Sequence, residues 1–320
     1  MSPREYDLSI VVVSTNEAHW LERCLTTVYA RAGHVRLDVV VVDNESSDGT
    51  NDLVRERFPD ARVVRCPNRG FAHANNRALV TCSARYALCL NPDTEIVDGT
   101  FGRLVEMLDR RPEIGLLGVK QLAGDGSLYP TVRRFPNAGR ALAEAFTLER
   151  WALRPSNLGE RELDLGRYDE ERECDWTTGA FMLIRREALL GAGLMDERLF
   201  LFGDEPDLCV RLKRSGWKVV HSPAMTIVHH AGKAGVRPAL VAQDVYARRV
   251  YARKHFAPVH RFAYLGAVAA RYAVRSLDPG QRAAGARALR TLVGLQAPPF
   301  GAPPPTSIDA STLNGSPAGR

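Results

Sequence analysis

The chain has 320 residues, 45% hydrophobic and 25% charged, which is the composition of a globular protein able to bury a substantial core. Its formal net charge of +6 at pH 7 comes mainly from arginine, and a genomic bias in composition explains this as well as an anionic partner does. No helix-turn-helix, zinc-finger or RNA-binding signature accompanies the charge, so nucleic acid is not an expected partner.

Three features of the sequence indicate a cytoplasmic protein. Residues 1–7 are charged and lack the apolar stretch of a secretory signal. No run approaches the roughly 20 apolar residues that span a bilayer. The six cysteines include no C-x-x-C pair and mostly lie in apolar segments, as reduced core residues do.

Residues 8–122 alternate short β-branched runs with segments of helical period. Ser47 or Asp48 is expected near the N-cap of the second helix. Strands separated by helices with short loops predict a doubly wound, mostly parallel α/β sheet. The strands are expected at residues 8–14, 37–42, 63–65, 86–90 and 114–119, and the helices at residues 17–31, 47–58, 71–80 and 99–110.

The rhythm of the sequence changes after Lys120. Pro279 and Gly280 break a long helical stretch near the end of the chain, and a proline-rich tail follows. We expect a hairpin turn at residues 124–127, a mobile loop over a cleft at 154–173, strands at 181–184, 217–220 and 225–228, and helices at 137–151, 186–190, 206–215, 236–256 and 259–295. The domains predicted are a sheet domain at residues 1–235, a helical extension at 236–296 and a disordered tail at 297–320.

Polar residues follow four of the expected strands, at the carboxyl ends where an open α/β sheet binds its ligands. Asp43 is placed to accept hydrogen bonds from a ribose or a nucleobase, although an Asx-turn also explains it. Gly70, which follows Arg69, permits close approach of the backbone, and a helix beginning there offers free amides to a phosphate. A tight turn with a capped helix is the alternative.

Asp93 ends a turn that Pro92 stiffens, so its carboxylate projects in a fixed direction. It could meet Mg²⁺ or Mn²⁺ if substrate phosphates supply the other oxygens. His229 ends the strand expected at residues 225–228 and is either a metal or diphosphate contact or a structural residue, while His230 is interpreted as structural.

Three acids, Asp204, Glu205 and Asp207, lie after an aromatic run at residues 200–202 and before the helix expected at 206–215. Acids at a helix N-terminus interact favourably with the helix dipole, so capping explains part of this cluster. Capping needs fewer than three acids, however. One of them beside the aromatic residues could act as a general base towards a hydroxyl.

Taken in chain order, these motifs resemble glycosyltransferase family 2, and most closely its bacterial rhamnosyltransferase-like branch. The resemblance covers roughly residues 8–256 and depends on order and spacing more than on any single motif. It is carried by residues 9–16, 42–44, 70–72, 75–76, 91–93, 178–180, 204–205, 207–209 and 216–217, together with Ser46, Asp48, Asn68, Arg211 and His229.

The resemblance implies a GT-A fold that uses a nucleotide-diphospho-sugar and inverts the anomeric carbon. Asp93 stands where the metal-binding D-x-D motif of the family ends, with Asn91 in place of the first acid and His229 assisting. Glu205 stands at the position of the catalytic base, which is usually Asp, and Asp204 is the second candidate for that role. Donor-binding roles are implied for Thr15, Asn16, Glu17, Asp43, Asn44, Asn68, Arg69, Gly70, Phe71, Asn75 and Asn91, and acceptor-side roles for Asp175, Trp176, Thr178 and Gly179.

The function expected from the resemblance is transfer of a sugar, with rhamnose the first candidate, from a dTDP- or UDP-sugar to a hydroxyl of a glycan or polyprenyl-linked acceptor. Such a reaction belongs to cell-wall or surface-polysaccharide assembly and uses Mg²⁺ or Mn²⁺. Arginines among apolar residues at 259–295 suit peripheral contact with the inner face of the cell membrane; packing on the sheet domain or on a second subunit is the alternative.

Two other classes of function are the alternatives. One is a catalytically weak protein that binds a nucleotide-sugar. The other is a Rossmann-type oxidoreductase, but such folds carry G-x-G-x-x-G directly after the first strand, and residues 15–19 do not contain it.

Overall fold

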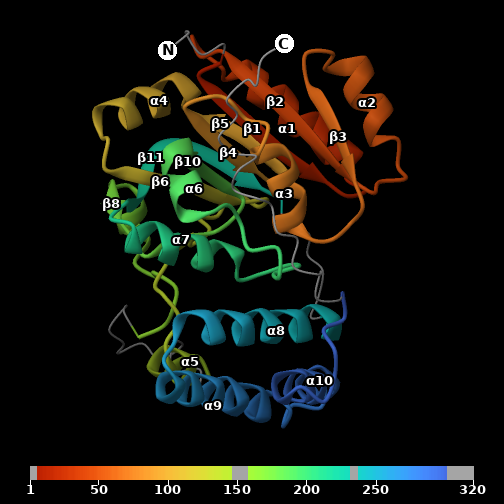
Figure 1. Ribbon diagram of the computed structural model, residues 1–320, viewed down its shortest axis with the longest axis vertical. Coiled ribbons are helices and arrows are strands. Elements are labelled where there is room, and N and C mark those ends of the chain that lie inside the picture. Colours follow the sequence, from red (N-terminus) through yellow and green to blue (C-terminus); the bar gives the residue numbers. More distant parts are fainter. Residues whose placement is uncertain (1–5, 146–157, 231–236, 301–320) are drawn as a thin grey trace, which may run out of the picture.

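A nine-stranded sheet forms the centre of the sheet domain (Figure 1). The computed structural model describes residues 6–145, 158–230 and 237–300. The strands of this sheet are β1 (Leu8–Ser14), β2 (Leu37–Asn44), β3 (Arg62–Cys66), β4 (Tyr86–Leu90), β5 (Thr94–Asp98), β6 (Ile114–Ala123), β8 (Arg172–Glu173), β10 (Phe181–Arg185) and β11 (Lys218–His229). They lie in the order β3-β2-β1-β4-β10-β6-β11-β5, with β8 paired to β11.

The sheet is mostly parallel, as expected. Strands β1 to β4 pair in parallel, and so do β6 and β11. Strand β10 is antiparallel to both of its neighbours, β4 and β6, and β5 is antiparallel to β11 at the edge. The carboxyl ends of β1, β2 and β4 therefore lie at the same edge of the sheet as the amino end of β10.

Helices cover both faces of the sheet, which confirms the doubly wound arrangement. Alternate valines of β2 enter different cores: Val39 and Val41 pack in one, Val40 and Val42 in the other. Burial on both faces is why this strand is an unbroken apolar run. One face carries α1 (Ala18–Ala30), α2 (Thr50–Arg57) and α4 (Phe101–Arg110), and the other carries α3 (Phe71–Leu79), α6 (Arg186–Ala192) and α7 (Asp204–Arg214).

A third core belongs to helices beside the sheet domain (Figure 1). The helices are α5 (Ala138–Ala145), α8 (Pro238–His255), α9 (Pro258–Arg275) and α10 (Arg282–Val293). The expected break at Pro279 falls between α9 and α10 and is confirmed. Helix α5 precedes the predicted domain boundary at residue 235 but packs with the C-terminal helices, with Ala141 in their shared core.

Asp207 connects the sheet domain to these C-terminal helices. Its carboxylate lies 2.7 Å from Nε2 of His255 and 2.8 Å from Nζ of Lys254, both on α8. Arg211, one turn further along α7, pairs with it at 2.9 Å. Burial raises the pKa of Asp207, but His255, Arg211 and Lys254 outweigh burial and hold that pKa below its usual value.

The prediction of a mobile loop at residues 154–173 is wrong for residues 158–173, the part that the structure describes. Tyr168 closes a 3-10 helix (Leu165–Tyr168) and is fully buried. Its hydroxyl accepts a hydrogen bond from the amide of Val132 and donates one to the carbonyl of Glu162, both at 3.1 Å. The Glu162 carboxylate binds three arginines. This polar network fixes the segment, whose charged sequence resembles that of a loop.

Several expected boundaries differ from the structure. Helix α2 begins at Thr50 with Gly49 as its N-cap residue, and Asp48 lies beside the N-cap as expected, with Oδ1 accepting a hydrogen bond from the amide of Thr50 at 3.2 Å. Helix α7 begins at Asp204, two residues earlier than expected, because Gly203 turns into it at φ 79°. The two strands expected at residues 217–228 are one strand, β11, with an irregularity between Ser222 and Thr226.

Strand β5 was not expected, and neither was the small antiparallel sheet of β7 (Val132–Arg133) and β9 (Trp176–Thr177). The hairpin turn at residues 124–127 is confirmed by the hydrogen bond from the amide of Ala123 to the carbonyl of Ser127. The six cysteines are free thiols. Residues 146–157 and 301–320, which hold the end of the helix expected at 137–151 and most of the expected tail, lie outside the described residues.

Candidate active site

A cavity of about 330 Å³ lies at the edge where β1, β2 and β4 end. The strand-end residues of the sequence analysis meet there, although they are far apart in the chain. Its lining includes Thr15, Glu17, Asn44, Asn68, Gly70, Phe71, Asn91 and Asp93, together with Phe200 and Leu201. We call it the donor-side cavity.

Four residues with expected donor-binding roles do not line this cavity: Asn16, Asp43, Arg69 and Asn75. Asp43 is fully buried, with Oδ1 accepting from the amide of Ser46 at 2.8 Å and Oδ2 from Nε of Arg65 at 3.1 Å. Asn16 accepts a hydrogen bond from the amide of Ser47 at 2.7 Å. These two side chains hold the loops that follow β1 and β2.

Gly70 lies against the backbone of Phe200 and not beside open space. It adopts φ 102°, and a Cβ added there would lie 2.4 Å from the carbonyl oxygen of Phe200. The amide of Phe71 donates to this same oxygen at 2.8 Å. The first amide of α3 is therefore not free for a phosphate, contrary to the expectation, because the 200–203 segment occupies it. Arg69 is exposed, and the buried Asn75 donates to the carbonyl of Phe71 at 2.9 Å.

Asp93 and His229 face each other beside the donor-side cavity. Nε2 of His229 lies 3.1 Å from Oδ1 of Asp93 and 3.3 Å from Nδ2 of Asn91. Nδ1 of His229 lies 2.8 Å from Nε2 of Gln121, which is 2% exposed. His230 instead binds Glu95 at 2.6 Å, in agreement with a structural role.

Glu17 is the second acid in the lining of the donor-side cavity. Burial, and then the charge of Asp93, raise its pKa to about 7. Among the described residues no three His, Cys, Asp or Glu side chains gather into a metal-binding group. Asp93 and His229 could supply two ligands to a cation, which would then take its other ligands from outside these two side chains.

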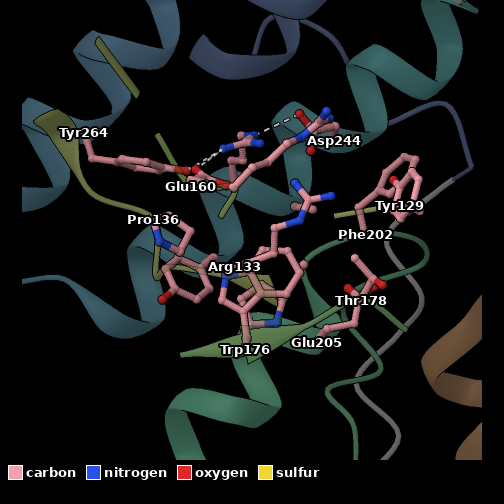
Figure 2. A pocket seen from close by; sticks show the side chains of 16 residues that line it. Tyr129, Arg133, Pro136, Glu160, Trp176, Thr178, Phe202, Glu205, Asp244 and Tyr264 are labelled. Carbon is pink, nitrogen blue, oxygen red and sulfur yellow. Dashed lines mark hydrogen bonds and ion pairs between the residues drawn. The ribbon is translucent and has the colours of Figure 1, made fainter. Parts of the chain in front are cut away.

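Glu205 lies at the start of α7 and lines a second cavity of about 310 Å³ (Figure 2). Its Oε1 accepts a hydrogen bond from the amide of Gly179 at 3.1 Å. Burial raises the pKa of Glu205, a shift that the Gly179 amide and the charge of Arg133 oppose. Trp176 and Thr178 line the same cavity, which we call the acceptor-side cavity.

Asp204 does not line the acceptor-side cavity and is 3% exposed. Burial, and then the charge of Glu205, raise the pKa of Asp204 well above its usual value. Asp175 is also absent from the lining, and its Oδ2 accepts a hydrogen bond from the amide of Phe135 at 2.8 Å. The geometry therefore places Glu205, rather than Asp204, in contact with the cavity.

The two cavities lie on either side of residues 200–203. Phe200 and Leu201 line the donor-side cavity, and Phe202 and Gly203 line the acceptor-side cavity. The amide of Asn91 donates to the carbonyl of Ala180 at 3.1 Å, next to the Gly179 amide that binds Glu205. Asp93 and Glu205 therefore belong to one region of the molecule.

Gln121 and Arg133 belong to this region and are not among the residues expected from sequence. Gln121 follows the strand expected at residues 114–119, so the strand-end rule that selected Asp93 could have found it. Arg133 carries no comparable signal, because its place depends on how residues 130–135 pack against β9.

The doubly wound sheet and the polar residues that line the cavity at its carboxyl edge form the architecture of a GT-A glycosyltransferase. The model of the family described as "Glycosyltransferase like family 2" matches residues 3–252. The chain belongs to glycosyltransferase family 2 and is a glycosyltransferase. This assignment does not favour a Rossmann-type oxidoreductase or a binding protein without catalysis.

One relative is the N-acetylglucosaminyl-diphospho-decaprenol L-rhamnosyltransferase of Mycobacterium tuberculosis, 30% identical over 245 residues, which are 72% of this chain and 79% of that protein. Two solved structures share the fold. GalNAc-T7 with UDP, GalNAc and Mn²⁺ has a TM-score of 0.56 and 15% identity, over 77% of this chain and 48% of that one. The mannosyltransferase PcManGT of Pyrobaculum calidifontis, with GDP-Man and Mn²⁺, has a TM-score of 0.53 and 19% identity, over 92% and 82%. The GT-A fold is thereby confirmed.

Proposed function

We propose that this protein transfers a sugar, with rhamnose the first candidate, from a dTDP- or UDP-sugar to a hydroxyl of a polyprenyl-diphosphate-linked acceptor in cell-wall assembly, inverting the anomeric carbon. One observation carries the proposal: Glu205 opens into the acceptor-side cavity, while Asp93 and His229 stand at the donor-side cavity across residues 200–203. The activity named for the mycobacterial relative supports the donor sugar and the acceptor type.

Asp93 and His229 are the proposed protein ligands of a Mg²⁺ or Mn²⁺ ion. One carboxylate and one imidazole are few ligands, which suits a cation that takes its remaining oxygens from the donor's diphosphate and from water. Bound there, the ion supplies positive charge that offsets the charge developing on the diphosphate. Thr15, Asn44 and Asn68 supply polar groups for the nucleoside in the same cavity.

Glu205 is the proposed catalytic base. As the acceptor oxygen attacks the anomeric carbon, its proton passes to the Glu205 carboxylate. The bond from the anomeric carbon to the diphosphate oxygen breaks on the opposite side, and the nucleoside diphosphate leaves with the electron pair. The Gly179 amide holds Oε1 of Glu205, so the other carboxylate oxygen is the one proposed to face the hydroxyl.

The proposed location is the cytoplasmic face of the membrane that holds the lipid acceptor. Within the described ranges, each helix falls short of the length and apolar character that crossing a bilayer demands. At the start of α9, Val259 and Phe262 are 79% and 84% exposed, with His260 and Arg261 between them. Exposed apolar side chains beside basic ones suit contact with an anionic lipid surface. Arg271, in contrast, pairs with Glu144.

The test of this function is incubation of the pure protein with Mn²⁺, a short-chain prenyl-diphospho-N-acetylglucosamine and a panel of nucleotide-sugars. We expect release of nucleoside diphosphate with one preferred donor, dTDP-rhamnose first, and a product with inverted anomeric configuration by NMR. A protein that neither binds any nucleotide-sugar of the panel nor forms product with any of them would contradict the proposal.

A further inference from the structure

Arg133 is a half-buried cation that lines the acceptor-side cavity. It ends β7, and Figure 2 shows it beside Trp176, with its guanidinium carbon 5.7 Å from the centre of that ring. Its Nε is buried without a hydrogen-bond partner. Among the residues that the structure describes, no acid forms an ion pair with Arg133, and no residue forms a hydrogen bond with its guanidinium.

The acids that line the acceptor-side cavity are engaged elsewhere. Arg248 forms ion pairs with two of them: its Nη1 lies 3.1 Å from Glu160 and its Nε lies 2.9 Å from Asp244. Glu205 accepts from the Gly179 amide. Burial raises the pKa of Glu160, which favours its neutral form. The charge of Arg133 acts on Glu205 and opposes the rise of its pKa, but the two side chains form no ion pair. The guanidinium of Arg133 therefore has no carboxylate of the cavity lining directly bonded to it.

A second arginine adds to the positive charge of this cavity. Arg161 also lines the acceptor-side cavity, and its backbone forms an isolated antiparallel bridge with that of Arg133. Burial, and then the charge of Arg161, lower the pKa of Arg133. A desolvated guanidinium beside a like charge is costly unless an anion meets it, and arginine binds phosphate through paired hydrogen bonds.

We propose that Arg133, together with Arg161, binds the phosphate or diphosphate that joins the acceptor's sugar to its lipid. This inference rests on the proposed function and adds the residues that recognise the acceptor. It also sets the acceptor's size. Arg133 and Glu205 line the same cavity of about 310 Å³, so the attacking hydroxyl and the anionic linkage must both fit within that space, as they do when a single sugar separates them. An acceptor with a long glycan before its diphosphate would not place both groups correctly.

The test compares two acceptors in the full-length protein: N-acetylglucosamine linked through a diphosphate to a short prenyl chain, and a neutral octyl N-acetylglucosaminide. The variants are Arg133→Met and Arg161→Met, with Arg55→Met as the matched control on the exposed surface of α2. The readouts are KM and kcat for each acceptor, and binding of the diphospho-acceptor without donor by calorimetry. Unfolding temperature and nucleotide affinity report whether each variant is folded.

We expect the unaltered protein to prefer the diphospho-acceptor, and Arg133→Met to raise its KM and its dissociation constant about tenfold or more, the loss of a hydrogen bond to a charged group. The KM of the neutral acceptor should change less than about twofold, although its kcat should fall because the charge of Arg133 no longer opposes the rise of the Glu205 pKa. Comparing an acceptor that carries a monophosphate with the diphospho-acceptor shows which of the two linkages Arg133 binds. An equal rise in KM with both acceptors, or unchanged binding of the diphospho-acceptor, would overturn the inference. If the protein uses no donor at all, the proposed function has failed, but calorimetry with the diphospho-acceptor still tests whether Arg133 binds the linkage.

Discussion

Nδ1 of His229 lies 2.8 Å from Nε2 of Gln121, and this contact joins the two sides of the active site. Oε1 of the same amide lies 3.4 Å from Oγ1 of Thr178, which lines the acceptor-side cavity. Nε2 of His229, on the other side of the ring, faces Asp93. A buried glutamine thus orients the imidazole that we propose to be a metal ligand.

Replacing Gln121 with Leu should weaken Mn²⁺ binding, because groups that orient a metal-binding histidine contribute about tenfold or more to metal affinity. Mn²⁺ affinity in the presence of nucleoside diphosphate can be measured by electron paramagnetic resonance. Gln281→Leu, in the linker between α9 and α10, is the control and should leave the affinity unchanged. An unaltered affinity in Gln121→Leu would show that the contact plays no such part.

Gly70 and Gly49 form a matched pair for testing the contact with Phe200. Both have positive φ, 102° and 83°, but a Cβ at Gly49 meets nothing within 4 Å, whereas one at Gly70 meets the Phe200 backbone. Gly49→Ala should cost about 1 kcal/mol through backbone strain alone. Gly70→Ala should cost several times more in urea unfolding and should also weaken nucleotide binding. Equal costs would mean that the backbone of residues 200–203 moves away freely.

Asp204→Asn should stabilise the protein at alkaline pH. The pKa of Asp204 is raised in the folded state, so folding becomes less favourable as pH rises through that pKa, and asparagine does not ionise. The unfolding temperature should rise by about 2 °C or more at pH 8, and the gain should shrink as pH falls towards the unfolded pKa of about 3.9.

Asp207→Asn is the control with the opposite sign. The pKa of Asp207 is lowered by His255 and its neighbours, so the ionised form contributes stability above the unfolded pKa of about 3.9, and that contribution is lost as pH falls through the lower folded pKa. Its replacement should destabilise the protein at pH 7 by about 3–5 kcal/mol. Variants of Asp204 and Asp207 that shift the unfolding temperature in the same direction at pH 8 would contradict both assignments.

The start of α9 gives a prediction about membranes. Replacing Val259 and Phe262 with Ser should lower binding to anionic vesicles by about tenfold or more, since each buried apolar side chain contributes about 1.5–3 kcal/mol. Leu165→Ser, on the sheet domain and 50% exposed, is the control. Cosedimentation with vesicles of phosphatidylglycerol and phosphatidylcholine measures the effect. Binding that survives the double replacement would place the membrane contact elsewhere.

The sequence predicted the parts of this molecule that depend on local patterns. The apolar run of β1 and the polar residues after it can be interpreted within a window of about ten residues. The rule that an open α/β sheet binds ligands at the carboxyl ends of its strands then predicts the place of Asp93. The same reasoning missed β5, whose pairing with β11 depends on a partner more than a hundred residues away. It could not show that Gly70 meets Phe200, or that Arg133 enters the cavity of Glu205, because both depend on tertiary packing.

The most direct test of the account compares Asp93→Asn with Glu205→Gln in two assays: nucleotide-sugar affinity with and without Mn²⁺, and the rate of transfer. We predict that Asp93→Asn loses the part of donor affinity that depends on Mn²⁺. Glu205→Gln should keep donor affinity while transfer falls by about 10²–10⁴-fold, the contribution of a positioned base. Transfer near the unaltered rate in Glu205→Gln, or full Mn²⁺ dependence of binding in Asp93→Asn, would contradict the division of this site into a metal-assisted donor side and a base on the acceptor side.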